Sequence, residues 1–218
     1  MSNLKFVHSG GNSVSLTTPT SNPGSNVTFK LPAADGSAGQ VLQTDGNGNL
    51  NWVSLPTGGL SMAQQWRFDT DSDIQFSGSY YLTQYWGVQD QAGAGNIGSS
   101  MTQSSGVFTF PSTGIYHIIF TAGWYESGGN ARRATWGYIE TTQDNGSSYT
   151  TASTVGSNSN GGTSGTTHAN LRISTIFDVT DTSTHKCRFR VHSSNTINLW
   201  ANTANNITNA VFLRLGDT

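Results

Sequence analysis

Apolar residues recur at every second position in many short stretches of this chain, the period that places side chains on one face of a β-strand. The longest such stretch runs from Tyr116 to Trp124, and a shorter strand-like run precedes it. The tetrapeptide Pro111-Ser112-Thr113-Gly114 separates the two runs. We therefore predict a central β-hairpin over residues 106–124, with this tetrapeptide as its turn.

From residue 65 onward the strand-like segments, this hairpin included, indicate about eight to ten strands at spacings typical of a sandwich or jelly roll. No window carries apolar residues at helical spacing over three turns, so we expect almost no helix. The predicted fold class is all-β, with a C-terminal jelly-roll β-sandwich after a small, extended, β-rich N-terminal segment. Asn145-Gly146 is predicted to turn between two strands. Residues 150–167 lack periodicity and predict a long exposed loop, either a place for binding variation or an inert connection.

The first 57 residues consist of short alternating segments separated by Gly, Pro, Asn and Ser. Each segment is too short to be stable alone, so we expect this region to pack on the main domain or on copies of itself. Within it, Asp45-Gly46-Asn47-Gly48 predicts the turn of a hairpin. We assign residues 1–57 to an attachment or shaft segment, 58–64 to a linker, and 65–218 to the jelly roll.

Charge is scarce in this chain, which contains 10% charged residues against a typical value of about 25%. The net charge of −2 provides no field that would gather nucleic acid, so no nucleic-acid partner is expected. No apolar run has the length of a membrane span and the first residues do not resemble a signal peptide. We therefore expect synthesis in the host cytoplasm without secretion or membrane insertion. The single cysteine, Cys187, excludes an internal disulfide and is expected to be buried.

Catalytic patterns are absent from the sequence. The only glutamates, Glu126 and Glu140, lie beside loop-like segments and are expected to be solvated strand ends. The sequence contains no nucleophile elbow, phosphate-binding loop or dinucleotide fingerprint. We therefore predict that the protein is not an enzyme and needs no cofactor.

A calcium loop is suggested by Asp69, Asp71 and Asp73, because oxygen ligands two residues apart open such loops. However, Ile74 occupies the position of the turn glycine, and Tyr80 that of the bidentate acid. We therefore expect a solvated turn or strand edge at these aspartates, and no metal site.

Two groups of residues are candidates for contact with a ligand. In the predicted strand over residues 186–192 the basic residues share one face. They are candidates for contact with a phosphate or an acidic sugar, and the alternative is that they form a surface that faces solvent or another subunit. The outward set is Lys186, Arg188 and Arg190, and the inward set is Cys187, Phe189 and Val191. Aromatic residues form the second group, because sugar rings stack on exposed aromatic faces. The candidate carbohydrate contacts are Tyr85, Trp86, Tyr125 and Trp136, with packing in the core or along a trimer axis as the other interpretation.

Two stretches resemble known families. LPAADGSAGQVLQTDGNGNLNWV, residues 31–53, resembles a motif of phage virion proteins, particularly tail-fibre and head-fibre proteins of marine and cyanobacterial phages. This resemblance implies a virion structural protein whose residues 1–57 contact other virion proteins, with head and tail both open.

GVFTFPSTGIYHIIF, residues 106–120, is similar to the core signature of the complement-one-q and tumour necrosis factor superfamily. The matching residues are Phe108, Pro111, Gly114, Tyr116 and Phe120, and AVFLRL resembles the closing strand of the family, although the usual closing Gly-Phe pattern is absent. The resemblance implies a jelly roll that forms a homotrimer.

Together these features predict a non-enzymatic phage virion protein that acts as a fibre, knob or capsid-decoration component. It would attach to the particle by its N-terminal segment and present a trimeric jelly roll for adhesion to host-surface carbohydrate or for shell reinforcement. The alternative is a carbohydrate-binding module or adhesin of a bacterium. A depolymerase fibre is a third option, which would require an acidic pair.

Overall fold

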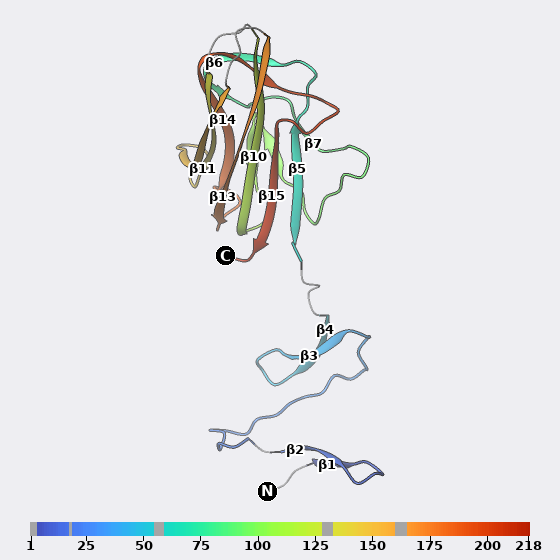
Figure 1. Ribbon diagram of the computed structural model, residues 1–218. Coiled ribbons are helices and arrows are strands. Elements are labelled where there is room, and N and C mark those ends of the chain that lie inside the picture. Colours follow the sequence, from blue (N-terminus) through green and yellow to red (C-terminus); the bar gives the residue numbers. More distant parts are fainter. Residues whose placement is uncertain (1–3, 18, 55–58, 128–132, 160–164) are drawn as a thin grey trace. The chain divides into compact units, whose positions relative to one another are not determined.

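The computed structural model describes residues 4–17, 19–54, 59–127, 133–159 and 165–218. These residues form fifteen β-strands and no helix (Figure 1), which confirms the predicted all-β class. In the described ranges there is accordingly no helix long and apolar enough to span a membrane. The chain divides into two compact units, Met1–Gly58 and Gly59–Thr218.

The first unit contains two antiparallel hairpins, formed by β1 (Leu4–Val7) with β2 (Ser13–Leu16), and by β3 (Gln40–Thr44) with β4 (Leu50–Ser54). The second hairpin confirms the prediction for its stretch. Its turn is held by the Asp45 carboxylate, which accepts hydrogen bonds from the backbone N–H groups of Asn47 at 2.8 Å and Asn49 at 3.1 Å. None of the described residues of this unit is buried, so its hairpins have no core of their own.

The second unit contains eleven strands: β5 (Met62–Phe68), β6 (Ile74–Tyr81), β7 (Trp86–Val88), β8 (Thr102–Ser104), β9 (Val107–Thr109), β10 (Gly114–Ser127), β11 (Arg133–Thr142), β12 (Thr150–Ser159), β13 (Thr166–Val179), β14 (Lys186–Trp200) and β15 (Asn209–Gly216). Strand β5 begins within the range 58–64 that the sequence suggested as a linker. The strands form two layers (Figure 1), one with the order β7-β5-β15-β10-β13 and the other with the order β6-β14-β11-β12. We call these the first and second sheets; the short strands β9 and β8 extend the second one beside β14. The two sheets are joined where β14 pairs with β10 at Gly123–Tyr125.

The core lies between the two sheets and is rich in aromatic rings. Alternate residues of β10 are completely buried, as predicted, and these are Tyr116, Ile118, Phe120, Ala122 and Trp124. Phe120 stacks on Phe189 of β14 with ring centroids 4.7 Å apart, which connects one sheet to the other. Burying a large apolar side chain contributes roughly 1.5–3 kcal/mol, so ring packing of this kind can stabilise the fold without disulfides.

The predicted hairpin over residues 106–124 is wrong. Strand β9 pairs with β8 and β14, whereas β10 pairs with β13, β15 and part of β14. The 111–114 turn therefore carries the chain from the second sheet to the first. This corner is fixed by the Tyr116 hydroxyl, which donates to the Ser112 carbonyl oxygen at 3.0 Å, and by Phe110 against the Tyr116 ring at 4.7 Å.

The long loop predicted for residues 150–167 is also wrong, although residues 160–164 lie outside the described residues. Strand β12 occupies Thr150–Ser159 and pairs along its length with β11, and β13 begins at Thr166. The Asn145-Gly146 turn that precedes β12 is confirmed, with φ angles of 58° and 90°. Residues 150–159 have few apolar side chains, but β11 offers them a complete edge of backbone partners, which stabilises a polar strand without requiring a large buried face.

Candidate functional site

The outward face of the second sheet gathers arginine and tyrosine side chains. Alternation along β14 turns Cys187, Phe189 and Val191 into the core, as predicted. The intervening residues face outward, and the register sets Arg190 between Tyr138 of β11 and Tyr81 of β6. We name this surface the arginine–tyrosine platform, and it consists of Tyr81, Tyr138, Glu140, Tyr149, Arg188 and Arg190.

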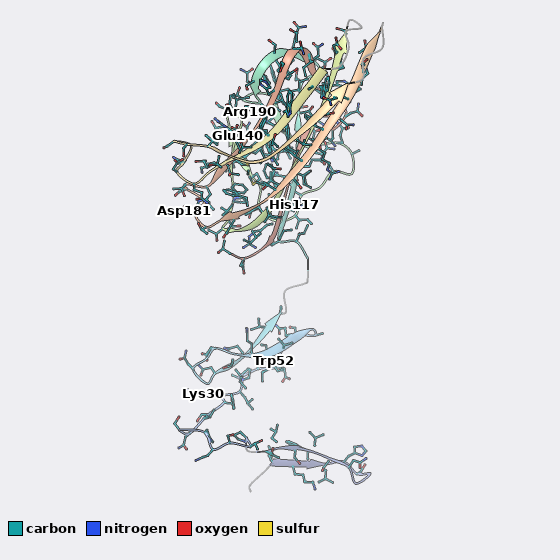
Figure 2. All side chains as sticks on the ribbon, turned by 60° about the vertical axis from the view of Figure 1, so that its left-hand side comes forward. Lys30, Trp52, His117, Glu140, Asp181 and Arg190 are labelled. Carbon is teal, nitrogen blue, oxygen red and sulfur yellow. The ribbon has the colours of Figure 1, made fainter. Side chains whose placement is uncertain are left out.

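One carboxylate holds both arginines of the platform (Figure 2 labels Glu140 and Arg190 side by side). Arg188 Nε lies 2.8 Å from Glu140 Oε2, and Arg190 Nε lies 2.8 Å from Glu140 Oε1. The Glu140 side chain is 7% exposed, Arg190 14% and Arg188 28%. Glu140 is therefore buried, which corrects its expected position at a solvated strand end; Glu126 is buried as well. Burial opposes the charged form of Arg190, but the hydrogen bond and attraction to Glu140 outweigh it and raise the pKa of that guanidinium.

Tyrosine rings cover the flat faces of the guanidinium groups. Arg188 Cζ lies 3.6 Å from the ring centroid of Tyr149 and 4.5 Å from that of Tyr81. Arg190 Cζ lies 3.6 Å from the ring centroid of Tyr138. Such cation–π contacts fix the plane of each guanidinium, so its N–H groups point in set directions. Burial is the largest influence on Tyr149 and raises its pKa, so its hydroxyl stays protonated and can donate a hydrogen bond.

Polar and aromatic side chains continue the platform toward one end of the sheet. Arg190 Nη1 donates to Ser79 Oγ at 3.2 Å, and Ser79 Oγ lies 3.1 Å from His192 Nδ1. The His192 ring is 5.9 Å from the half-buried ring of Trp136. Trp136 is thus one predicted carbohydrate contact that the fold places beside charged groups.

The other predicted aromatic contacts lie elsewhere. Trp86 is buried in the core, where its indole N–H donates to the Leu82 carbonyl at 2.7 Å, so it cannot contact a ligand in the folded protein. Tyr85 is 45% exposed, and its ring makes a T-shaped contact with the ring of Phe68. The structure therefore does not bring the four predicted residues into one site.

Tyr125 belongs to a separate aromatic group at the end of the first sheet. Its ring lies 5.4 Å from His168, which lies 4.7 Å from Trp200, and its hydroxyl donates to Asp73 at 2.9 Å. A hollow of about 260 Å³ adjoins this group, lined by Thr121, Gly123, His168, Ala169, Asn170, Trp200 and Ile207. This hollow has aromatic walls but no Lys or Arg side chain at its lining.

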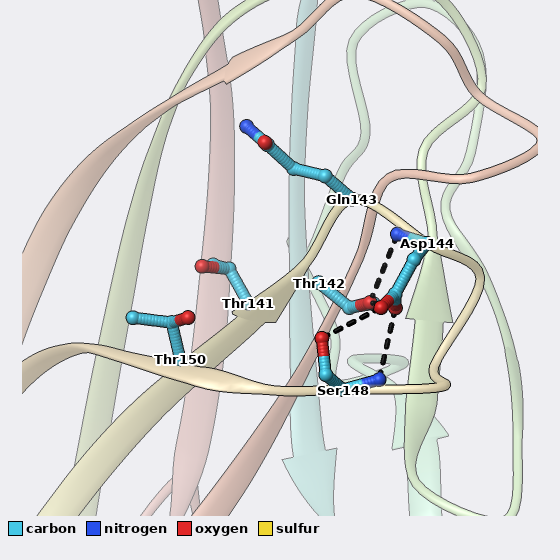
Figure 3. A pocket seen from close by; sticks show the side chains of 6 residues that line it. All are labelled: Thr141, Thr142, Gln143, Asp144, Ser148 and Thr150. Atoms are coloured by element: carbon cyan, nitrogen blue, oxygen red, sulfur yellow. Dashed lines mark hydrogen bonds between the residues drawn. The ribbon is translucent and has the colours of Figure 1, made fainter.

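A larger depression of about 480 Å³ lies at the β11–β12 turn, lined by Thr141, Thr142, Gln143, Asp144, Ser148 and Thr150 (Figure 3). Three of these residues are joined by hydrogen bonds. The Asp144 carboxylate accepts bonds from the Thr142 hydroxyl, the Ser148 hydroxyl at 2.6 Å and the Ser148 backbone N–H at 3.0 Å. These bonds lower the pKa of Asp144 to about 2. The arrangement stabilises the turn.

The three aspartates of the calcium-like pattern each have a structural role. Asp69 pairs with the buried Arg67 at 2.9 Å, Asp71 accepts from Thr203, and Asp73 accepts from Ala201 and Tyr125. Asp71 and Asp73 thereby tie the segment after β5 to the segment after β14. Within the described ranges no group of three or more His, Cys, Asp or Glu residues is arranged to hold a metal ion.

The sequence singled out Trp136, Arg188 and Arg190 but missed Tyr149 and the contact of Tyr81 with Arg188. Alternation along 133–142 and 186–192 carried enough signal to place Tyr138 and Glu140 on the same outward face. Tyr149 lies outside any strand, and Tyr81 approaches Arg188 only because β6 pairs with β14. No local pattern reveals contacts of this kind.

No family model matches this chain, and no curated protein matches it. Among solved structures, murine APRIL at pH 5.0 is similar with a TM-score of 0.50 and 8% sequence identity over 71% of this chain and 98% of that one. Eiger TNF from S. frugiperda has a TM-score of 0.49 and 10% identity, covering 72% of this chain and 93% of its own. At such low identity the likeness concerns the fold alone, and the fold of the second unit is a jelly roll of the tumour necrosis factor type.

Proposed function

We propose that this protein is a non-enzymatic, homotrimeric structural protein of a phage virion. Its jelly roll presents a binding surface outward, and its N-terminal unit attaches it to the particle. The observation that carries the trimer is an uncovered apolar surface on the outward side of the first sheet. The virion setting is supported by the resemblance of residues 31–53 to phage fibre proteins.

The uncovered surface crosses three strands in register. Ile119 of β10 is opposite Val211 of β15, while His117 lies between Leu213 of β15 and Ile176 of β13. Ile176 is 58% exposed, and the other apolar side chains are half-buried. We call Ile119, Ile176, Val211 and Leu213 the apolar sheet face. A chain with few charges and such a face gains stability when copies cover it.

A trimer accounts for this face better than a monomer does, because jelly rolls of this type assemble around an axis in the superfamily that residues 106–120 resemble. Three copies would also multiply weak contacts on their outward surfaces, so that no single site has to bind tightly. The absence of any catalytic constellation from the sequence patterns is consistent with adhesion or reinforcement as the role.

The assembly is tested by size-exclusion chromatography with light scattering on the full chain. We expect three times the chain mass for the wild type and a shift to the monomer mass for Ile119→Asp, which puts a charge in the apolar sheet face. Thr154→Asp, on the second sheet, is the matched control and should remain trimeric. A wild-type monomer at micromolar concentration would refute the trimer.

The virion role is tested by mass spectrometry and immunogold labelling of purified phage particles. Stoichiometric presence in the particle, with label on the head or tail surface, is expected. A protein absent from particles and found instead on a bacterial surface would favour the second candidate, a bacterial carbohydrate-binding adhesin. This second candidate function is supported by the aromatic residues of the arginine–tyrosine platform, which offer stacking surfaces for sugar rings.

A further inference from the structure

We propose that the arginine–tyrosine platform binds a saccharide that carries a carboxylate, such as a sialic or uronic acid. The inference deepens the proposed attachment role and rests on it, because it names the ligand class of the outward surface. The platform lies on the second sheet, whereas the apolar sheet face belongs to the first sheet. Covering one of these sheets with neighbouring subunits would therefore leave the other accessible.

The charge balance of the platform favours an anion. Two guanidinium groups share the single carboxylate of Glu140, which leaves an excess of one positive charge. The buried arginine of the first sheet has the opposite balance, since Arg67 lies between Asp69 at 2.9 Å and Asp90 at 2.7 Å. Of these two arginine clusters only the platform has an excess of positive charge, and a ligand carboxylate would complete its pairing.

Hydrogen-bond donors remain at the platform once its internal bonds are counted. Arg188 uses Nε for Glu140, and its two terminal nitrogens bond no atom among the described residues. Arg190 uses Nε for Glu140 and Nη1 for Ser79, so Nη2 has no partner within the described ranges. The paired terminal nitrogens of Arg188 match the spacing of a carboxylate, and its 28% exposure leaves them within reach.

Aromatic rings beside these donors favour a sugar over a simple anion. Tyr81 is 39% exposed and Tyr149 is half-buried, with Arg188 between their rings. Trp136 and His192 lie farther along the same face. Sugar rings stack their C–H groups on such surfaces, while tyrosine hydroxyl and imidazole groups bond their hydroxyls. The platform is thus built for a ring that carries both hydroxyls and a carboxylate.

The test is isothermal titration calorimetry on the full-length protein with three probes. These are 3′-sialyllactose, a trimer of galacturonic acid, and lactose as the neutral match. We expect saturable binding of at least one acidic saccharide and at least tenfold weaker binding of lactose. The two acidic probes distinguish a sialic from a uronic acid. Equal binding of lactose, or no binding of either acidic saccharide, would overturn the proposal.

Variants assign the binding to the platform. Arg188→Lys keeps a charge for Glu140 but loses the planar fork, and we expect at least a tenfold loss of affinity in a protein that still unfolds cooperatively above the assay temperature. Arg172→Lys, on the exposed side of β13, is the matched control and should bind as the wild type does. Unchanged affinity in Arg188→Lys would contradict the assignment. If a glutamate tetrapeptide binds as tightly as the saccharide, the platform recognises carboxylates without a sugar ring, and the saccharide proposal is refuted.

Light scattering on the same samples separates this inference from the proposed function. A trimer present in virions that binds no acidic saccharide refutes the ligand alone. A monomer that binds the saccharide through Arg188 refutes the assembly and leaves the ligand intact.

Discussion

Replacing Glu140 by Gln tests whether the buried carboxylate stabilises the second sheet. Glu140 makes two charge-assisted hydrogen bonds of 2.8 Å, to Arg188 and Arg190. Such bonds contribute about 1.5–3 kcal/mol each. Gln retains one oxygen acceptor, and solvent reaches both guanidinium groups, so part of this sum is recovered. We expect Glu140→Gln to lower the free energy of unfolding by about 2 kcal/mol.

The assay is urea denaturation followed by tryptophan fluorescence, at one fixed protein concentration because the proposed assembly would make stability depend on concentration. Asp178→Asn is the matched control, since Asp178 is exposed on β13, and it should change the free energy of unfolding by no more than about 0.5 kcal/mol. A loss below about 0.5 kcal/mol for Glu140→Gln would refute the reasoning.

A double variant tests why Glu140→Gln should lower the free energy of unfolding. If Glu140 acts by neutralising the guanidinium groups, removing one of them should offset part of the damage. The double variant Glu140→Gln with Arg188→Met should therefore be less destabilised than the sum of its two single variants. Strict additivity would show that the two side chains do not act as a unit.

Two further predictions concern turns. Asp144 has a pKa of about 2, below the ordinary 3.8, so the stability it contributes is present above pH 3.8 and is lost as pH falls through about 2. Asp144→Asn should therefore unfold more easily than the wild type at pH 7, the difference should have become small by pH 2, and a pH-independent difference in urea midpoint would argue against this. Gly114 has a φ of 143°, and an added Cβ would meet the Gly216 carbonyl oxygen at 2.6 Å and the Arg214 side chain. Gly114→Ala should cost about 1–3 kcal/mol in urea denaturation, whereas Gly95→Ala, in open space, should be nearly neutral.

Alternation predicted which residues of a strand face the core, but it could not predict which strand lies beside it. Phe189 and Val191 were placed inward correctly, because one buried face imposes a period of two along β14. The 106–124 stretch also alternates, yet its two strands belong to different sheets. Pairing depends on residues distant in sequence, such as Phe212 of β15 and Phe177 of β13, which pack against Phe110.

Amino-acid composition does not determine the local structure at two places in this chain. Residues 150–159 carry Thr, Ser and Gly, which suggested a loop, but the edge of β11 supplies their backbone partners. Tyr85 and Trp86 are neighbours with the same sugar-binding chemistry, and only the fold decides that Tyr85 is exposed and Trp86 buried. The outward residues of the single strand β14 were therefore predictable from the sequence. The contacts that require β6, β11 and β14 to lie side by side were not.

Assembly of the jelly roll would also affect the stability of the N-terminal unit. In the β1–β2 hairpin Leu4 is opposite Leu16 and Phe6 is opposite Val14, so one side is apolar and exposed. A two-stranded hairpin is marginal in water without a partner for such a side. If three jelly rolls associate, the chain connections hold three such hairpins at an effective concentration on the order of millimolar, and each can cover the next. The stability of the N-terminal hairpins would then depend on assembly through the apolar sheet face, and loss of the proposed trimer in Ile119→Asp would destabilise both units.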